Sequence, residues 1–180
     1  MTSFDGQLPK DREDRELATF EIVKAETVRG RDESIDRILR YVEQKTGSTR
    51  FARRADIQPA DLKEFLPDIC FFIPYYTAGG VLNDVRITLM GTNVVSFYGE
   101  LTDKSVRDHP SPDVAGRILT CAAAAIENRE ATFAEATSLS SEQDYLAVKA
   151  LYVPMAEDGD MIDRLLVYVR VVGKSLLENK

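Results

Sequence analysis

The histidine and the two cysteines are the residues of this 180-residue chain best suited to acid–base, metal or thiol chemistry. His109, the only histidine, lies in the segment RDHPSP, with no second histidine and no cysteine at metal-ligand spacing. Cys70 and Cys121 each lie inside an apolar run, which is typical of small buried residues in a reducing compartment. We predict no metal site, no disulfide and a surface-loop position for His109.

A junction of glycine and helix raises the question of phosphate binding. The stretch RITLMGTNVVSFYGE, residues 86–100, passes from an alternating pattern through Gly91 and Thr92 into an apolar segment. Phosphate loops normally carry several glycines or a Gly-Lys-Ser/Thr run, and this sequence has neither, nor a Gly-x-Ser-x-Gly nucleophile elbow. We therefore predict a corner of the fold at this point, with Thr92 capping a short helix.

The charged residues do not indicate a catalytic site. Arg50 and Arg54 have the four-residue spacing of cyclic dinucleotide receptors, but the accompanying Asp/Asn-x-Ser-x-x-Gly element is missing. Paired carboxylates fall in turns and tails, where solvation is the ordinary explanation. A net charge of -7 argues against nucleic acid as a partner. No apolar run approaches a membrane span and no secretion signal opens the chain, so we expect a cytoplasmic protein without membrane contact.

The N-terminal quarter of the chain is predicted to be helical. Residues 1–16 have the composition of a flexible tail, and residues 17–48 form an N-terminal helical segment ahead of a folded domain over residues 49–175 and a short tail, 176–180. A weak helical pattern covers residues 17–28, and a stronger one covers 32–45, with Asp32 as its cap and Gly47 as its stop. One apolar stripe on this second helix predicts a homodimer interface through Ile35, Ile38, Leu39 and Val42.

The remaining pattern predicts an α+β domain. An apolar run over residues 69–76 and an alternating run over 84–90 predict a hairpin, and short helices follow. Asp113 is expected to cap the longest helix, VAGRILTCAAAAIENRE. Three strands close the chain, an edge-like one over 132–139 and a hairpin over 145–154 and 162–172. We expect a five-stranded antiparallel sheet with short helices and one long helix on one face, preceded by the N-terminal helix.

Four segments of the sequence resemble the PAS domain family, in particular the PAS-like proteins that occur as small standalone proteins in alphaproteobacteria. The resemblance covers roughly residues 53–172 and is specific for a fold, not for a chemistry. Thr102 and Asp103 stand where the family usually has Thr-Gly, and we expect the turn to survive because aspartate tolerates a positive φ. The segments are RRADIQPADLKEFLPDI (53–69), RITLMGTNVV (86–95), YGELTDKSV (98–106) and YVPMAEDGDMIDRLL (152–166).

The resemblance implies a pocket between the sheet and the helices. Some PAS sensors hold haem through a helix histidine, but His109 precedes the long helix, and neither cysteine has the Asn-Cys-Arg setting of flavin-photoadduct domains. The resemblance therefore favours a small apolar ligand over haem or flavin, with tyrosine hydroxyls as polar handles. The predicted lining residues are Phe97, Tyr98, Ile118, Cys121, Val148, Tyr152 and Val167.

Two functions from different classes follow from these observations. The first is a cytoplasmic PAS-type sensory or protein-interaction module without an attached catalytic output domain, acting through a protein partner, a second copy or a small apolar ligand. The alternative is an enzyme on a curved-sheet α+β scaffold of the ketosteroid isomerase type, acting on a small hydrophobic substrate through a buried carboxylate. The predicted inward positions hold no Asp or Glu, which disfavours the alternative.

Overall fold

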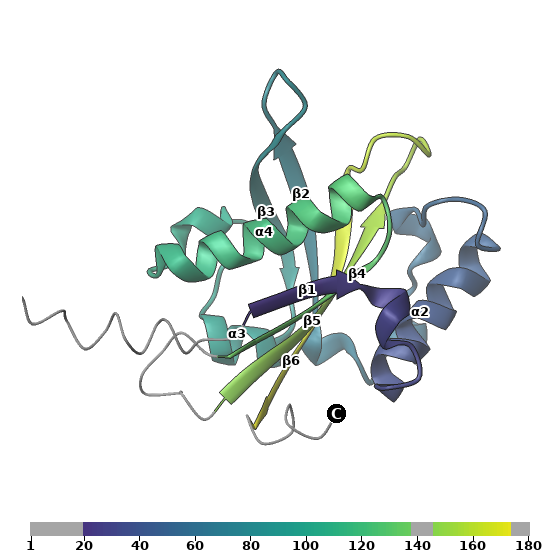
Figure 1. Cartoon of the computed structure of the whole chain (residues 1–180), viewed down its shortest axis with the longest axis horizontal. Coiled ribbons are helices and arrows are strands. Elements are labelled where there is room, and N and C mark those ends of the chain that lie inside the picture. The colour runs from purple at the N-terminus through teal and green to yellow at the C-terminus, as the bar shows by residue number, and fades with distance from the viewer. Residues whose placement is uncertain (1–19, 138–145, 174–180) are drawn as a thin grey trace, which may run out of the picture.

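The computed structural model describes residues 20–137 and 146–173 (Figure 1). The predicted tails, 1–16 and 176–180, lie outside the described residues, as do positions 17–19 of the predicted first helix. Among the described residues, no helix combines the length and the apolar character that crossing a membrane requires.

One antiparallel sheet forms the centre of the fold. Its strands lie in the order β1-β4-β5-β6-β2-β3, so the chain's first and third strands are the two edges. The strand predicted over residues 69–76 is confirmed, and the four others are confirmed with small shifts of their ends, while their positions 138, 139 and 145 lie outside the described residues. The strands are β1 (Phe20–Lys24), β2 (Ile69–Tyr76), β3 (Leu82–Met90), β4 (Thr132–Thr137), β5 (Leu146–Met155) and β6 (Arg164–Gly173).

Strand β1 corrects two predictions, the helix over residues 17–28 and the count of five strands. It pairs with β4, with Phe20 opposite Ala136 and Lys24 opposite Thr132, and only Ala25–Val28 forms a short 3-10 helix, η1. The strand-like alternation of Phe20 and Ile22 outweighs the helix propensity of the neighbouring residues. A short isolated helix is only marginally stable, whereas a strand at this place pairs along its length with β4. Strand β4, predicted to be edge-like, is therefore an inner strand.

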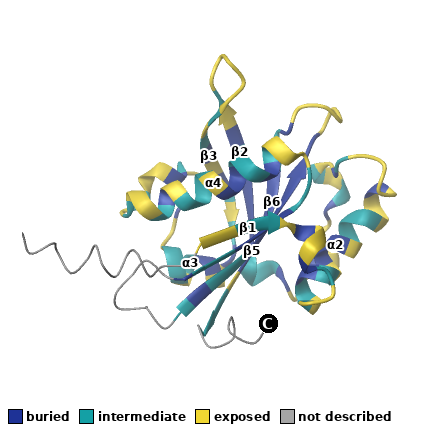
Figure 2. Ribbon diagram, in the orientation of Figure 1, coloured by how far each residue is buried: buried dark blue, intermediate teal, exposed yellow. Residues whose placement is uncertain are grey.

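Helices cover both faces of the sheet. The short helix after β3 and the long helix share one face, as predicted, and the N-terminal helix covers the other. Helices α3 (Thr92–Tyr98) and α4 (Pro112–Asn128) lie on one face, and α2 (Glu33–Thr46) lies on the other with short 3-10 turns from residues 54–68. Successive residues of β2 alternate between the two layers, since Cys70 and Phe72 pack under α4 while Phe71 packs under α2. Figure 2 shows the central strands buried between the two layers.

Helix α2 has the ends that the sequence predicts. The Asp32 carboxylate accepts hydrogen bonds from the backbone N–H groups of Ser34 and Ile35 at 3.0 and 3.2 Å. Gly47 ends the helix in the left-handed region, at a φ of 64°. The cap and the stop are both confirmed.

The apolar stripe of α2 packs on the chain's own sheet. Ile35 and Ile38 are 0% exposed and Leu39 is buried, while Val42 is partly buried at the margin of the same core. The expectation of an exposed stripe is therefore wrong, because this face of the sheet needs a cover and α2 supplies it. These side chains are not available to a second copy of the chain.

Helix α4 begins earlier than predicted. Ser111, and not Asp113, is the N-cap, and its hydroxyl accepts from the Val114 N–H at 3.4 Å. Pro112 occupies the first helical position, where its missing N–H costs no hydrogen bond. The proline therefore starts the helix.

The corner after β3 depends on glycine at position 91. A Cβ on Gly91 would lie 2.3 Å from the Pro67 carbonyl oxygen, and the Gly91 N–H donates to the Ile69 carbonyl at 2.8 Å. Close packing of backbone on backbone thus explains the glycine without a phosphate. Gly91 is also the N-cap of α3. The prediction that Thr92 caps this helix is therefore wrong, because Thr92 is its first helical residue.

The turn after α3 survives the replacement of the family's glycine. Asp103 has a φ of 63°, and its N–H donates to the Ile87 carbonyl at 2.7 Å. The prediction for this turn is confirmed. The turn ties the chain between α3 and α4 to the edge strand β3, and so fixes where α4 begins.

Candidate ligand cavity

A cavity of about 280 Å³ lies between α4 and the sheet. Helix α4 contributes one face to its wall, at spacings of three and four residues. The loop before α4, helix α3 and strands β1, β4 and β5 contribute the rest. Most of the lining is apolar. The lining residues are Phe20, Phe97, Tyr98, His109, Ser111, Val114, Arg117, Ile118, Cys121, Ala134, Ala136, Thr137, Val148, Ala150 and Tyr152.

Six of the seven predicted pocket residues line this cavity. The exception is Val167, which is fully buried in the neighbouring core and does not reach the cavity. The correction has a simple reason, because β6 lies one strand further from β1 and β4, under which the cavity opens. As contacts of a ligand, Phe97, Tyr98, Ile118, Cys121, Val148 and Tyr152 remain a prediction.

The inner end of the cavity is neutral. The Tyr152 hydroxyl hydrogen-bonds the Cys121 thiol. The Tyr152 ring meets the Phe72 ring edge-to-face, with ring centroids 6.2 Å apart. Burial raises the pKa of Tyr98 and of Tyr152 above the ordinary tyrosine value. Burial also raises the pKa of the Cys121 thiol to about 12, so this sulfur stays protonated at neutral pH and is a poor nucleophile.

Arg117 brings a positive charge to the cavity wall. Its guanidinium donates to the Thr137 carbonyl at 2.7 Å and lies over the Phe20 ring, 5.1 Å from the ring centroid. Burial lowers the pKa of Arg117, while the nearby Tyr98, Cys121 and Asp113 act in the opposite direction. The group stays charged at neutral pH, but it is less well solvated than a surface arginine.

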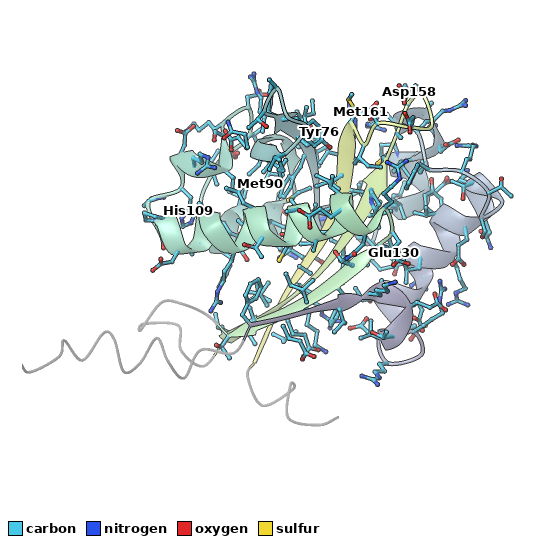
Figure 3. The ribbon with its side chains drawn as sticks, turned by 45° about the horizontal axis from the view of Figure 1, so that its top comes forward. Tyr76, Met90, His109, Glu130, Asp158 and Met161 are labelled. Carbon is cyan, nitrogen blue, oxygen red and sulfur yellow. The ribbon has the colours of Figure 1, made fainter. Side chains whose placement is uncertain are left out.

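His109 lies in the loop before α4, as predicted, but it is partly buried because it also lines the cavity. Figure 3 shows it beside the N-terminal end of α4. Its Nδ1 accepts from the Ser111 N–H at 3.0 Å, and its ring lies edge-on to Tyr98 with centroids 6.2 Å apart. The Ser111 carbonyl also lies 3.3 Å from Nδ1, but the shorter contact is with the Ser111 N–H, which can only donate, so we assign the proton of the neutral ring to Nε2.

Three polar lining residues, Arg117, His109 and Ser111, were not predicted from the sequence. Arg117 stands three residues after Val114 and four before Cys121, so the helical period that selected Ile118 also points to Arg117. Helical periodicity could therefore have identified Arg117 as a lining residue. No pattern in the sequence points to His109 and Ser111, because their positions depend on the path of the loop before α4 in the folded protein.

Arg50 and Arg54, the pair with four-residue spacing, have structural partners. Arg50 pairs with Asp56 at 2.6 Å, and Arg54 lies over the Phe71 ring at 4.7 Å while it donates to the Ile57 carbonyl. The two arginines therefore brace the loop after α2. Across residues 20–137 and 146–173, no three or more His, Cys, Asp or Glu side chains gather as a metal ion would require.

Comparison with protein families agrees with the fold. A family model described as "PAS domain" matches residues 31–169, a span that includes α2, strands β2 to β5, the first part of β6, and α4. Comparisons with curated proteins and with solved structures gave no match. The family match covers most of the chain and confirms the resemblance carried by the four sequence segments, and so the chain belongs to the PAS domain family.

Proposed function

We propose that this chain is a sensory module that binds a small, predominantly apolar molecule in the cavity between α4 and the sheet. Membership of the PAS domain family indicates a sensory or interaction module. The finer statement rests on one observation, the roughly 280 Å³ cavity whose lining is mainly apolar with a few polar groups. Small-molecule sites in proteins commonly combine these features.

The size of the cavity supports a small ligand over a large cofactor. A water molecule takes up about 30 Å³ in the liquid, so the cavity has room for roughly nine atoms of that size. Haem and flavins have several times as many non-hydrogen atoms. We therefore keep the prediction that neither is the ligand.

No observation favours the enzyme alternative. A ketosteroid isomerase-type reaction needs a carboxylate in the cavity, and none of the described lining residues is Asp or Glu. The buried thiol and tyrosines are neutral at physiological pH and offer no base. The proposal is binding without chemical conversion.

A protein partner in signalling, a homodimer and a cytoplasmic location also belong to the proposal. The location is supported by the two cysteines, Cys70 and Cys121, which are buried and free. The homodimer has lost its sequence argument, because the stripe of Ile35, Ile38 and Leu39 is buried within the chain. Sedimentation of the full chain measures the state directly, and a monomeric mass at micromolar concentration would remove the homodimer.

Native mass spectrometry of freshly purified full-length protein tests the binding proposal. We expect an added mass on the order of 150 Da, the mass of about ten non-hydrogen atoms. Ala136→Leu places a larger side chain in the cavity wall and should abolish the adduct, whereas the same change at the exposed Ala78 should retain it. An adduct that is equal in both variants, or absent from the native protein, would contradict the proposal.

A further inference from the structure

We propose that the ligand of this cavity is a small amphiphile, a monocarboxylate whose apolar body fills the cavity and whose anionic head lies at Arg117. The inference rests on the proposed function and deepens it by naming the ligand class. Three observations carry it: the sign of the charge on the lining, the partners of that charge, and the room available.

The lining has charge of only one sign among the described residues. Arg117 is its one permanently charged side chain, and none of the other residues around the cavity is Asp or Glu. The same lining includes the apolar residues Ile118, Val148 and Ala150. A ligand with an apolar body and one anionic group matches this combination, and a cationic ligand would meet repulsion.

The described partners of the Arg117 guanidinium leave its charge incompletely compensated. It donates to the neutral Thr137 carbonyl and lies over the Phe20 ring. The Asp113 carboxylate acts on this charge from one helical turn earlier, but Asp113 is exposed to water and does not line the cavity. A bound carboxylate would add a charge-assisted hydrogen bond in a partly desolvated place, where such bonds are strongest.

The N-terminal end of α4 adds donors of the same kind. His109 and Ser111 line the cavity next to the first turn of this 17-residue helix, where the helix dipole favours negative charge. With Nδ1 occupied by the Ser111 N–H, the neutral His109 ring has its proton on Nε2. The lining thus offers a guanidinium, an imidazole N–H and a hydroxyl, and no described lining residue is a carboxylate.

The available room sets the size of the probes. Space for roughly nine water-sized atoms corresponds to about ten non-hydrogen atoms in a covalently bonded ligand. Octanoate and phenylacetate both have this size, with a flexible and a rigid body respectively. Each has a neutral and a cationic counterpart with the same body: 1-octanol and octylamine, 2-phenylethanol and 2-phenylethylamine.

The test is titration calorimetry of the full-length protein with these six compounds. We expect the carboxylate of at least one series to bind about tenfold more tightly than its alcohol, the usual effect of one hydrogen bond to a charged group, and the amine to bind most weakly. Arg117→Met should remove this preference while the alcohol's affinity changes by less than about threefold. Arg117→Lys keeps the charge and should retain part of the preference.

Arg31→Met is the matched control, because Arg31 is exposed, lies near the start of α2 and does not line the cavity. It changes the net charge by the same amount and should leave all six affinities unchanged. If Arg117→Met does not fold, as judged by thermal unfolding, the head-group preference of the native protein and of Arg117→Lys still decides the question.

The outcomes separate this inference from the proposed function. Equal binding of carboxylate and alcohol, or a preference that persists in a folded Arg117→Met, overturns the head-group assignment and leaves an apolar binding site. Failure of all six compounds to bind overturns both proposals. Tighter binding of an amine also overturns the assignment, because it would show that Arg117 is neutralised within the protein.

Discussion

The two faces of the sheet are packed with side chains of different size. The core under α2 contains large residues such as Ile35, Ile38, Leu151 and Leu166, with two buried alanines. The core under α4 contains six buried alanines, and two of them, Ala134 and Ala150, lie in the cavity wall. The sheet is common to both cores, so the difference comes from the residues that alternate along its strands and from the helix that meets them.

This difference suggests a division of labour between the faces. Large, interdigitating side chains on the α2 face supply stability, because each buried isoleucine or leucine removes a large apolar area from water. Small residues on the α4 face leave room that the chain's own side chains do not fill. The predictions below compare the faces, beginning with the largest expected effect.

Ile38→Ala should destabilise the protein most, by about 2–5 kcal/mol of unfolding free energy, because Ile38 is fully buried in the α2 core. Urea unfolding followed by circular dichroism measures this. Ile118→Ala makes the same deletion on α4, where Ile118 is half-buried beside the cavity, and should cost about 1–2 kcal/mol. Equal costs at the two positions would contradict the division between the faces.

Gly91→Ala tests the place where helical segments of the two faces meet. Its new Cβ would lie 2.3 Å from the Pro67 carbonyl oxygen, which is backbone and cannot turn aside. We expect a loss of about 1–3 kcal/mol, the usual cost of overpacking, measured by the same urea titration. Gly116→Ala is the control, since a Cβ there meets nothing within 4 Å and α4 should gain slightly from the better helix former. If Gly91→Ala left the free energy of unfolding unchanged, Gly91 would not be closely packed against the Pro67 carbonyl in solution.

The α2 face should also respond to acid. Hydrogen bonds from Arg50 and from the Arg53 N–H lower the pKa of Asp56 to about 2 from an ordinary value of 3.8. The stabilising effect of Asp56 is therefore complete above about pH 4 and is lost as the pH falls toward 2. The unfolding free energies of wild type and Asp56→Asn should differ at pH 6 and converge near pH 2.

Ser111→Ala serves as the comparison on the cavity face. It removes the α4 cap without removing a titrating group, so its deficit should be nearly constant over this pH range. A deficit of Asp56→Asn that stays constant with pH would mean that Asp56 does not titrate in its ion pair.

Ala136→Leu should have the smallest effect on stability. The added atoms enter existing space, so we expect the unfolding free energy to change by less than about 1 kcal/mol. Ala125→Leu, at a fully buried alanine of the same core that does not line the cavity, should cost more. If Ala136→Leu is the more costly change, the cavity is not open in solution.

The sequence predicted the fold best where one signal dominates. Two patterns each indicate a single type of element: the continuous apolar run of residues 69–76 indicates a strand, and the capped apolar stripe of α2 indicates a helix. Both elements were predicted correctly. Strand β1 was missed because residues 17–28 combine strand-like alternation with helix-favouring residues, and only the pairing with β4 decides between them. The partner of the α2 stripe was also missed, since a sequence does not tell a helix that covers its own sheet from one that covers a second copy.

The candidate site shows the same limit. Helical periodicity and the family resemblance led to Ile118 and Cys121, and strand alternation led to Val148 and Tyr152, which all line the cavity. Periodicity does not say how far along the sheet the cavity extends, so Val167 was included although it lies beyond it. His109 was excluded because its place depends on a hydrogen bond to Ser111 that only the folded loop provides.

A crystal structure of the full-length protein grown with octanoate would test the central claim most directly. The account predicts electron density for the chain between Ile118 and Ala150, under α4, with the carboxylate at Arg117. A cavity closed by rearranged side chains, or octanoate bound only elsewhere on the surface, would contradict it.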